Sequence, residues 1–231
     1  MEIAPGIHSM GQDKGGNVHA FLLDDGQELT LIDTLYDDDG KVVLDEIAQM
    51  GRRPADVKHI ILTHAHKSHL GGLAALKAAS GATVCSHEWE IDIIAGRRKA
   101  TPVSKIPKRP LAVLHLQLGL ALGFGRHVPS DVDRKLKAGD RVGPLEVVET
   151  PGHTPGSLSF WWPAKRALFV GDVIATWPEL APGWPGLTLD NPQNLRSVQQ
   201  LTDFGNADIL GVGHGEPITA DAAARVRDVA R

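Results

Sequence analysis

Short, nearly continuous apolar runs alternate along this chain with longer segments in which apolar residues recur every three or four positions. The short runs predict buried strands, and the longer segments predict helices that bury one face against a core. We expect strands at residues 18–23, 29–32, 59–62 and 82–86 and again at 145–149, 158–162, 167–170 and 209–212, with helices at 41–50, 70–79, 191–204 and 220–229. Two groups of strands with helices beside both predict an α/β protein built as a four-layer αβ/βα sandwich, in which two mixed β-sheets are flanked by helices.

The interval between the two halves has a different pattern. Residues 111–125 form the least polar stretch of the chain, but this stretch is too short and too often interrupted by glycine to span a bilayer. We expect residues 1–231 to form a single domain with a helical insertion around residues 90–130. Two interpretations of the inserted helix stay open: a helix packed on the core, or a flap whose apolar face covers a cleft and contacts an apolar substrate arm.

Three histidines fall within six residues, directly after the apolar run at residues 60–62. Alternate side chains of an extended backbone share a face, so His64 and His66 are expected to point the same way from the end of a strand. His69 follows as the chain turns toward the next helix. Neutral imidazole is a common zinc ligand, so a histidine cluster at this junction predicts a metal site.

Four further strand ends carry a histidine or an acid after an apolar run. Asp33 ends the first of these runs, His153 lies in a turn with two prolines and two glycines, Asp172 follows a glycine, and His214 lies between two glycines. A catalytic metal site is normally assembled from several loops of one scaffold. The sequence therefore predicts that these four side chains join the histidine cluster in one shared site.

These motifs resemble the metallo-β-lactamase-fold hydrolase superfamily, which includes glyoxalase II, acyl-homoserine lactonases and zinc β-lactamases. The family pattern is His-x-His-x-Asp-His, then a Pro-Gly-His-Thr turn, a Gly-Asp element and a Gly-His-Gly element, and the match extends over nearly the whole chain. By this resemblance six side chains would hold two metal ions, in two sets: His64, His66 and His153; and His69, His214 and a bridging Asp172. Asp33 resembles the family's acid that steadies ligands without binding metal.

The chain departs from the family pattern at one catalytic position, where Ser68 replaces the usual aspartate. In the family that carboxylate completes the second metal site and hydrogen-bonds the attacking water. A hydroxyl binds zinc poorly and is no base near neutral pH, so we expect a weakened second site. Three interpretations stay open: Ser68 caps the following helix, it marks a natural variant with one tight metal ion and altered chemistry, or it reflects inactivation.

The resemblance implies a metal-dependent hydrolase that cleaves an ester, thioester or lactone through a metal-bound hydroxide. Asp172 would orient the hydroxide and, without the usual aspartate, also receive its proton. Zinc is the expected cofactor, at one or two ions per chain, and iron, manganese or nickel could take its place. The alternative is a catalytically impaired or inactive binding protein on the same fold.

Composition fits an ordinary globular enzyme. The net charge of −4 gives no reason to expect nucleic-acid binding, and we expect a small-molecule substrate and no membrane partner, whereas the oligomeric state is open. The single cysteine, Cys85, rules out an internal disulfide and is interpreted as a core residue. The first residues lack the basic and apolar pattern of a secretion signal, so a cytoplasmic location is expected.

Some conspicuous residues lie outside these motifs. Lysine and arginine gather between residues 97 and 109, a run that we interpret as a solvated connecting segment, with an anion-binding lip as the alternative. Trp177, Trp184 and Leu187 follow Asp172 closely and are expected in a pocket wall. The remaining histidines are interpreted as structural or surface residues: His8, His19, His59, His87, His115 and His127.

Overall fold

Two mixed β-sheets form the centre of the protein in a computed structural model that describes residues 1–231. The first sheet has the strand order β1-β2-β3-β4-β5-β6-β7, antiparallel as far as β4 and parallel beyond it. Its strands are β1 (Glu2–Ala4), β2 (Ile7–Gln12), β3 (Val18–Asp24), β4 (Leu29–Ile32), β5 (Val57–Ile61), β6 (Thr83–His87) and β7 (Arg134–Leu136). The second sheet has the order β12-β11-β10-β9-β8, with β8 (Arg141–Val142), β9 (Leu145–Glu149), β10 (Leu158–Trp162), β11 (Ala167–Phe169) and β12 (Ile209–Gly211).

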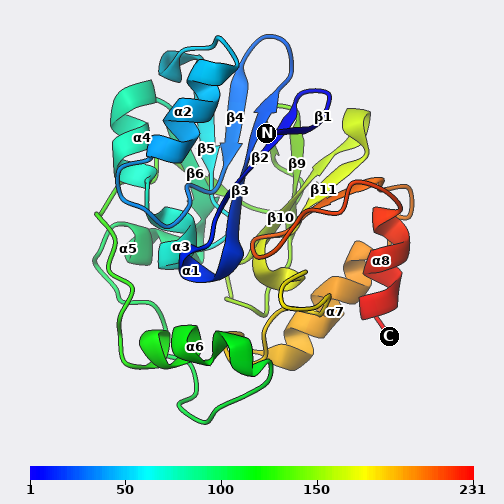
Figure 1. The fold of residues 1–231 in the computed structure, drawn as a ribbon. Coiled ribbons are helices and arrows are strands. Elements are labelled where there is room, and N and C mark those ends of the chain that lie inside the picture. Colours follow the sequence, from blue (N-terminus) through cyan, green and yellow to red (C-terminus); the bar gives the residue numbers. More distant parts are fainter.

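Helices cover the outer face of each sheet. Figure 1 shows α2 and α4 on one side of the sheets and α7 and α8 on the other, which gives the four layers expected from the sequence. The helices are α1 (Lys14–Asn17), α2 (Lys41–Gln49), α3 (Lys67–Leu70), α4 (Leu73–Ser80), α5 (Ile91–Ile94), α6 (Leu114–Ala121), α7 (Asn191–Leu201) and α8 (Ala222–Val229). The predicted αβ/βα sandwich with two mixed sheets is confirmed.

Alternation along the strands explains why the apolar runs are continuous. Leu31 of β4 packs in the cluster beneath α2 and α4, while its neighbour Ile32 packs between the two sheets. In the second sheet Phe169 faces the inter-sheet core and Leu168 faces the cluster beneath α7 and α8. Successive side chains point to opposite faces of a strand, so a strand buried on both faces needs an apolar residue at every position.

All eight predicted strands are present, each within two residues of its expected ends. The structure adds β1, β2, β7 and β8, whose residues carry no sustained apolar pattern. The helix expected at residues 70–79 is present as α4, which begins three residues later, and the short helix α3 precedes it. The two are separate helices at Gly71 and Gly72, where the backbone passes close to a neighbouring loop. A Cβ atom at Gly71 would lie only 2.1 Å from the carbonyl oxygen of Tyr36.

The segment between β6 and β7 carries α5 and α6 and lies at one end of the sandwich (Figure 1). Only residues 114–121 of the apolar stretch at 111–125 form the helix α6, which follows a 3-10 turn at Leu111–Val113. No helix of the structure is both long enough and apolar enough to cross a membrane. Cys85 is free and fully buried between the sheets, as predicted for a core residue.

Candidate metal centre

The predicted ligands come from loops at the carboxyl ends of four strands. His64, His66 and His69 follow β5, His153 follows β9, Asp172 follows β11 and His214 follows β12. Backbone hydrogen bonds join these loops: Gly213 N–H donates to the carbonyl of Gly171 at 2.8 Å, and Leu158 N–H donates to the carbonyl of Thr63 at 2.9 Å. The two sheets therefore bring all six side chains together at one end of the sandwich.

The first set of donor atoms is compact. His66 Nδ1 lies 3.1 Å from His64 Nε2 and 3.0 Å from His153 Nε2. Asp172 Oδ2 lies 3.3 Å from His153 Nε2. Four ligands placed tetrahedrally at zinc–nitrogen distances of about 2.0–2.1 Å would lie roughly 3.3 Å from one another. The spacing of these atoms therefore fits a single metal ion.

The second set shares the carboxylate of Asp172. His69 Nε2 lies 3.3 Å from Asp172 Oδ1, and His214 Nε2 lies 3.1 Å from Asp172 Oδ2. His69 Nε2 and Asp172 Oδ1 are buried, yet neither has a hydrogen-bond partner. Buried polar atoms without partners are costly, and a cation between these atoms would satisfy both. The donor atoms therefore fit a second ion, as the resemblance implied.

Hydrogen bonds on the outer side of three imidazoles fix which nitrogen faces the centre. His214 Nδ1 lies 2.8 Å from the carbonyl oxygen of Gly16, and His69 Nδ1 lies 2.8 Å from Asp33 Oδ2. Thr63 Oγ1 donates to Asp33 Oδ2 at 2.7 Å, so at its 3.0 Å contact with His64 Nδ1 it must accept. Each of these rings holds its proton on Nδ1 and turns the Nε2 lone pair toward the cluster, as a metal ligand requires.

Burial and charge set the protonation of the cluster. Burial holds the pKa of His64 and of His66 well below the ordinary histidine value and lowers that of His153 to about 4. Burial also lowers the pKa of His69, but the carboxylates of Asp172 and Asp33 outweigh it and raise that pKa to about 10. Burial raises the pKa of Asp172, yet the surrounding imidazoles hold it well below its usual range. A divalent ion would displace the His69 proton and meet three neutral imidazoles and an ionised carboxylate.

A glycine beside the carboxylate of Asp172 allows that carboxylate to lie close to the imidazole of His69. A Cβ atom at Gly213 would lie 2.1 Å from Asp172 Oδ1 and 2.9 Å from His69 Cε1. Any other residue would displace the carboxylate from the imidazoles. Gly213 is therefore part of the site, because it leaves room for Asp172.

The sequence matches the family described as the Metallo-beta-lactamase superfamily over residues 13–214. The chain belongs to the metallo-beta-lactamase superfamily. The family match includes all six predicted ligands as well as Asp33 and Ser68.

Individual relatives agree with this membership. An uncharacterised protein, YobT of Bacillus subtilis, is 28% identical over 209 residues, which cover 86% of this chain and 83% of that protein. A hydroxyacylglutathione hydrolase of Rhodospirillum rubrum is 30% identical over 152 residues, 63% of this chain and 46% of that enzyme. Among solved structures, a metallo-beta-lactamase family protein of Thermus thermophilus superposes with a TM-score of 0.69 and 25% identity, over 99% of this chain and 79% of that one.

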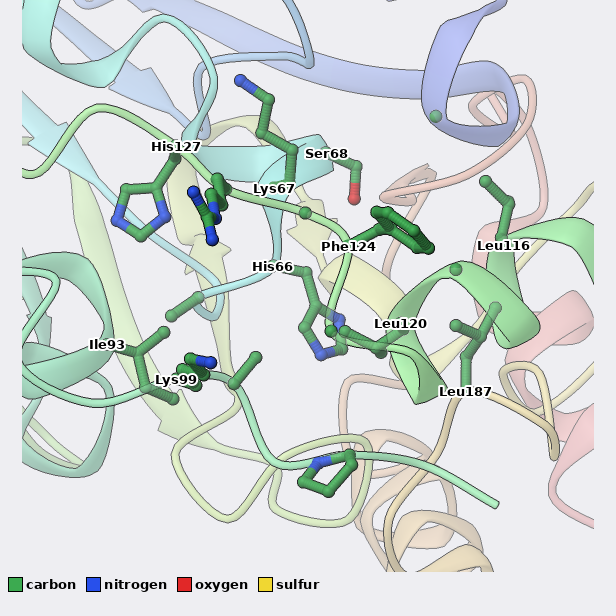
Figure 2. Close-up of a pocket in the computed structure, with 18 of the residues that line it drawn as sticks. His66, Lys67, Ser68, Ile93, Lys99, Leu116, Leu120, Phe124, His127 and Leu187 are labelled. Carbon is green, nitrogen blue, oxygen red and sulfur yellow. The ribbon is translucent and has the colours of Figure 1, made fainter. Parts of the chain in front are cut away.

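Ser68, at the position where the resemblance leads us to expect an aspartate, does not cap a helix. The N-cap of α3 is His66, and Ser68 is the second residue of that helix. The capping interpretation is wrong because α3 begins earlier than the sequence suggested. The Ser68 side chain lines the cavity above the cluster and turns toward it (Figure 2).

Glu90 is the functional-site neighbour that sequence reasoning missed. It is fully buried, accepts a hydrogen bond from the Ala65 N–H at 3.1 Å and accepts another from the Thr154 hydroxyl. Burial raises the pKa of its carboxyl to about 7. Glu90 thus joins the loop of His64 and His66 to the loop of His153. The sequence gives little signal for it, because Glu90 is the second of three acids that alternate with apolar residues after β6, between Glu88 and Asp92.

A cavity of about 670 Å³ opens over the cluster. His66, His153, Asp172 and His214 lie in its wall, and α6 and the loop after it form another wall. Figure 2 shows His66 between two groups of lining residues, with Lys99, Ile93 and His127 on one side and Leu116, Leu120 and Leu187 on the other. The inserted helix α6 therefore borders the candidate site and also packs on a small buried cluster, and its contact with a substrate stays a prediction.

The loop after Asp172 carries Trp177, Trp184 and Leu187, and only part of it lies in the cavity wall. Trp184 and Leu187 line the cavity, and the Trp184 ring lies against His214 with centroids 4.3 Å apart. Trp177 lies outside the lining and instead accepts a hydrogen bond from Trp184 Nε1 at its carbonyl oxygen, at 2.8 Å. Of the histidines that the sequence left outside the site, His127 lines the cavity, and its Nε2 lies 2.9 Å from the carbonyl oxygen of Ile94.

Proposed function

We propose that this protein is a metal-dependent hydrolase that cleaves an ester, thioester or lactone of a small molecule. The observation that carries the proposal is the convergence of five imidazoles and one carboxylate, in two sets that share Asp172, beside a cavity that members of both sets line. Membership of the metallo-beta-lactamase superfamily and the similarity to a hydroxyacylglutathione hydrolase support a metallo-hydrolase in general terms. The cavity volume suits a small-molecule ligand.

In this proposal His64, His66 and His153 hold one metal ion, and His69, His214 and Asp172 hold the other. A bound divalent ion supplies a Lewis acid that polarises the substrate carbonyl and makes water acidic enough to attack near neutral pH. Zinc is the cofactor that we expect for these imidazole ligands, and iron, manganese and nickel are the alternatives.

The protein's own residues position the reacting groups. Burial lowers the pKa of His64, His66 and His153, so these rings are neutral before a metal ion binds. Hydrogen bonds at the outer nitrogens of His64, His69 and His214 orient those rings, so little reorganisation accompanies binding. Asp172 aligns the attacking water, and its low pKa suits a ligand better than a proton acceptor. Trp184 and Leu187 exclude bulk water from one side of the site.

The proposal is tested by replacing a ligand. His153→Ala should remove most bound metal and lower the hydrolysis of 4-nitrophenyl acetate or a thioester by more than about 100-fold, since even supporting residues of a metal site are worth 10 to 100-fold. Elemental analysis and initial rates measure both effects. His115→Ala is the matched control, because His115 is exposed and lies outside the cavity. Wild-type turnover in His153→Ala would refute the proposal.

A second candidate function is an impaired enzyme that now only binds a ligand, and Ser68 is the residue that favours it. Its hydroxyl offers the second metal ion no carboxylate, although the side chain faces the cavity. We expect Ser68→Asp to raise bound metal toward two ions per chain and to raise ester hydrolysis about tenfold or more, as an added ligand tightens the second site. Metal content and rate are measured on the same preparation. The impaired-enzyme alternative would be removed if the wild type already binds two metal ions per chain and hydrolyses esters as fast as Ser68→Asp does.

A further inference from the structure

We infer that the substrate, or the product it yields, carries a negatively charged group separated from the scissile carbonyl by an apolar arm. The charged group would be bound by Lys99 and Arg126 and the arm by the apolar face of the insertion. This inference rests on the proposed function, because it names the class of substrate for that same cavity. The inference follows from the charges and apolar side chains that the insertion contributes to the cavity wall, and not from the metal centre itself.

The insertion is strongly basic in an acidic protein. Between residues 93 and 130 there is no aspartate or glutamate, whereas the whole chain has a net charge of −4. The same segment holds seven basic residues: Arg97, Arg98, Lys99, Lys105, Lys108, Arg109 and Arg126. Like charges concentrated on one segment repel one another and raise the local positive potential, which attracts anions.

Three of these cations line the cavity, none of them is paired with a carboxylate, and two of them have no side-chain hydrogen-bond partner at all. Arg98 is held against Trp89, with its guanidinium 4.0 Å from the ring centroid and a hydrogen bond to the Trp89 carbonyl oxygen. Lys99 and Arg126 also line the cavity, and neither forms a salt bridge or a side-chain hydrogen bond. Lys67 shows the contrast: it lines the same cavity but is paired with Asp38.

The cavity offers these free cations no internal counterion. Asp172 is the only acidic residue among the lining residues, and its carboxylate is enclosed by imidazoles. A ligand anion would therefore meet Lys99 and Arg126 without displacing a protein carboxylate. An anion beside a cation in a partly enclosed cavity is bound more strongly than one at an open surface.

The other side of the cavity is apolar. Leu116, Leu120 and Leu187 lie across His66 from Lys99 in Figure 2. Phe124 and Leu122 also line the cavity although they are 69% and 62% exposed. Such exposure of large apolar side chains is costly unless a ligand covers them. Their place in the cavity wall suits an alkyl or aryl arm.

The test compares ligands that differ by one charge. Zinc-loaded protein is titrated calorimetrically with hexanedioate, octanedioate and decanedioate, each against the monocarboxylate of the same chain length. We expect at least one dicarboxylate to bind about tenfold more tightly than its monocarboxylate, and Lys99→Gln/Arg126→Gln to abolish that preference, because each charge-assisted hydrogen bond contributes about this factor or more. Lys105→Gln/Lys108→Gln is the control, since it removes two charges from the same segment outside the cavity.

Four outcomes are decisive. The inference is overturned if every dicarboxylate binds as tightly as its monocarboxylate. It is also overturned if the control variant loses the preference for dicarboxylates to the same extent, because that result would indicate a general effect of positive charge and not a binding site. Half-esters of the same diacids with 4-nitrophenol then separate the two proposals. Hydrolysis of neutral and anionic esters at the same kcat/KM sustains the proposed function and overturns the inference. A charge preference in binding without hydrolysis of any ester sustains the anion site and refutes the proposed function.

Discussion

Asp33 shows how one side chain orients a metal centre from outside it. Its carboxylate accepts hydrogen bonds from the Thr63 N–H at 2.8 Å, from the Thr63 hydroxyl at 2.7 Å and from His69 Nδ1 at 2.8 Å. Through Thr63 it also fixes the ring of His64. One residue therefore sets the direction of a ligand in each of the two sets.

Replacing Asp33 by Asn should weaken metal binding by about 10 to 100-fold, the usual cost of losing such a supporting residue. An amide nitrogen in place of Oδ2 would donate to His69 Nδ1 and move the ring proton to the nitrogen that faces the metal. Asparagine tolerates the positive φ of 58° at this position, so the backbone should be preserved. Competition with a metal chelator measures the affinity, and Asp39→Asn in an exposed loop is the control. Unchanged affinity would show that Asp33 only supports the fold.

At the scale of elements, α6 separates a cavity-facing residue from an outward one. Leu120 lines the cavity, whereas Leu118, on the same helix, is 38% exposed and lies outside it. The pair can therefore distinguish contact with a substrate from a general contribution of the helix to stability.

Leu120→Ala should raise KM for esters with long alkyl arms by about fivefold or more, because a buried leucine side chain contributes about 1.5 kcal/mol or more to burial. Leu118→Ala should leave KM unchanged. Rates on short and long alkyl esters give the comparison, and thermal unfolding shows whether either variant is destabilised. An equal effect of both substitutions would indicate that α6 serves only as a packed helix.

Elements also differ in how far the sequence predicts them. The eight buried strands were predicted because apolar residues on both faces leave a continuous run. The strands β1, β2, β7 and β8 were missed because their polar positions interrupt any apolar run. The partner of β7 is also remote in the sequence, as the pairing of Cys85 with Arg134 shows. The break between α3 and α4 depends on the approach of Tyr36, which no local pattern reports.

On the scale of the whole molecule, Glu90 connects the two halves. It comes from the first half and bonds both to Ala65 beside the first ligands and to Thr154 beside His153. Burial raises its pKa from an ordinary value near 4.5 to about 7. The folded protein therefore binds more protons at this residue than the unfolded chain does between about pH 4.5 and pH 7.

This difference predicts a pH dependence of stability. The contribution of Glu90 to the free energy of unfolding is fully present below about pH 4.5 and is lost as the pH rises through about 7, a change of about 3 kcal/mol. Glu90→Gln cannot ionise, so the wild type should lose stability relative to this variant across that range. Urea unfolding of both proteins in chelator, with the exposed Glu179→Gln as control, measures the difference. Parallel pH profiles for wild type and Glu90→Gln would contradict the prediction.

The sequence by itself determined the layers of the sandwich and the identity of the candidate ligands. Both are local properties. Successive side chains of a strand point to opposite faces, so a continuous apolar run indicates a strand that is buried on both faces, and a histidine or aspartate after such a run indicates the end of the strand. The structure brings all six predicted ligands together, although their binding of metal stays a prediction.

Only the tertiary structure decided how the candidate site is built around those residues. It placed Ser68 inside α3 and facing the cavity, fixed the ring nitrogens of His64, His69 and His214, and set Glu90 between two ligand loops. It also carried Lys99 and Arg126 to the cavity wall. These features depend on contacts between residues far apart in the chain, because the packing of two sheets and the insertion determines which polar atoms meet.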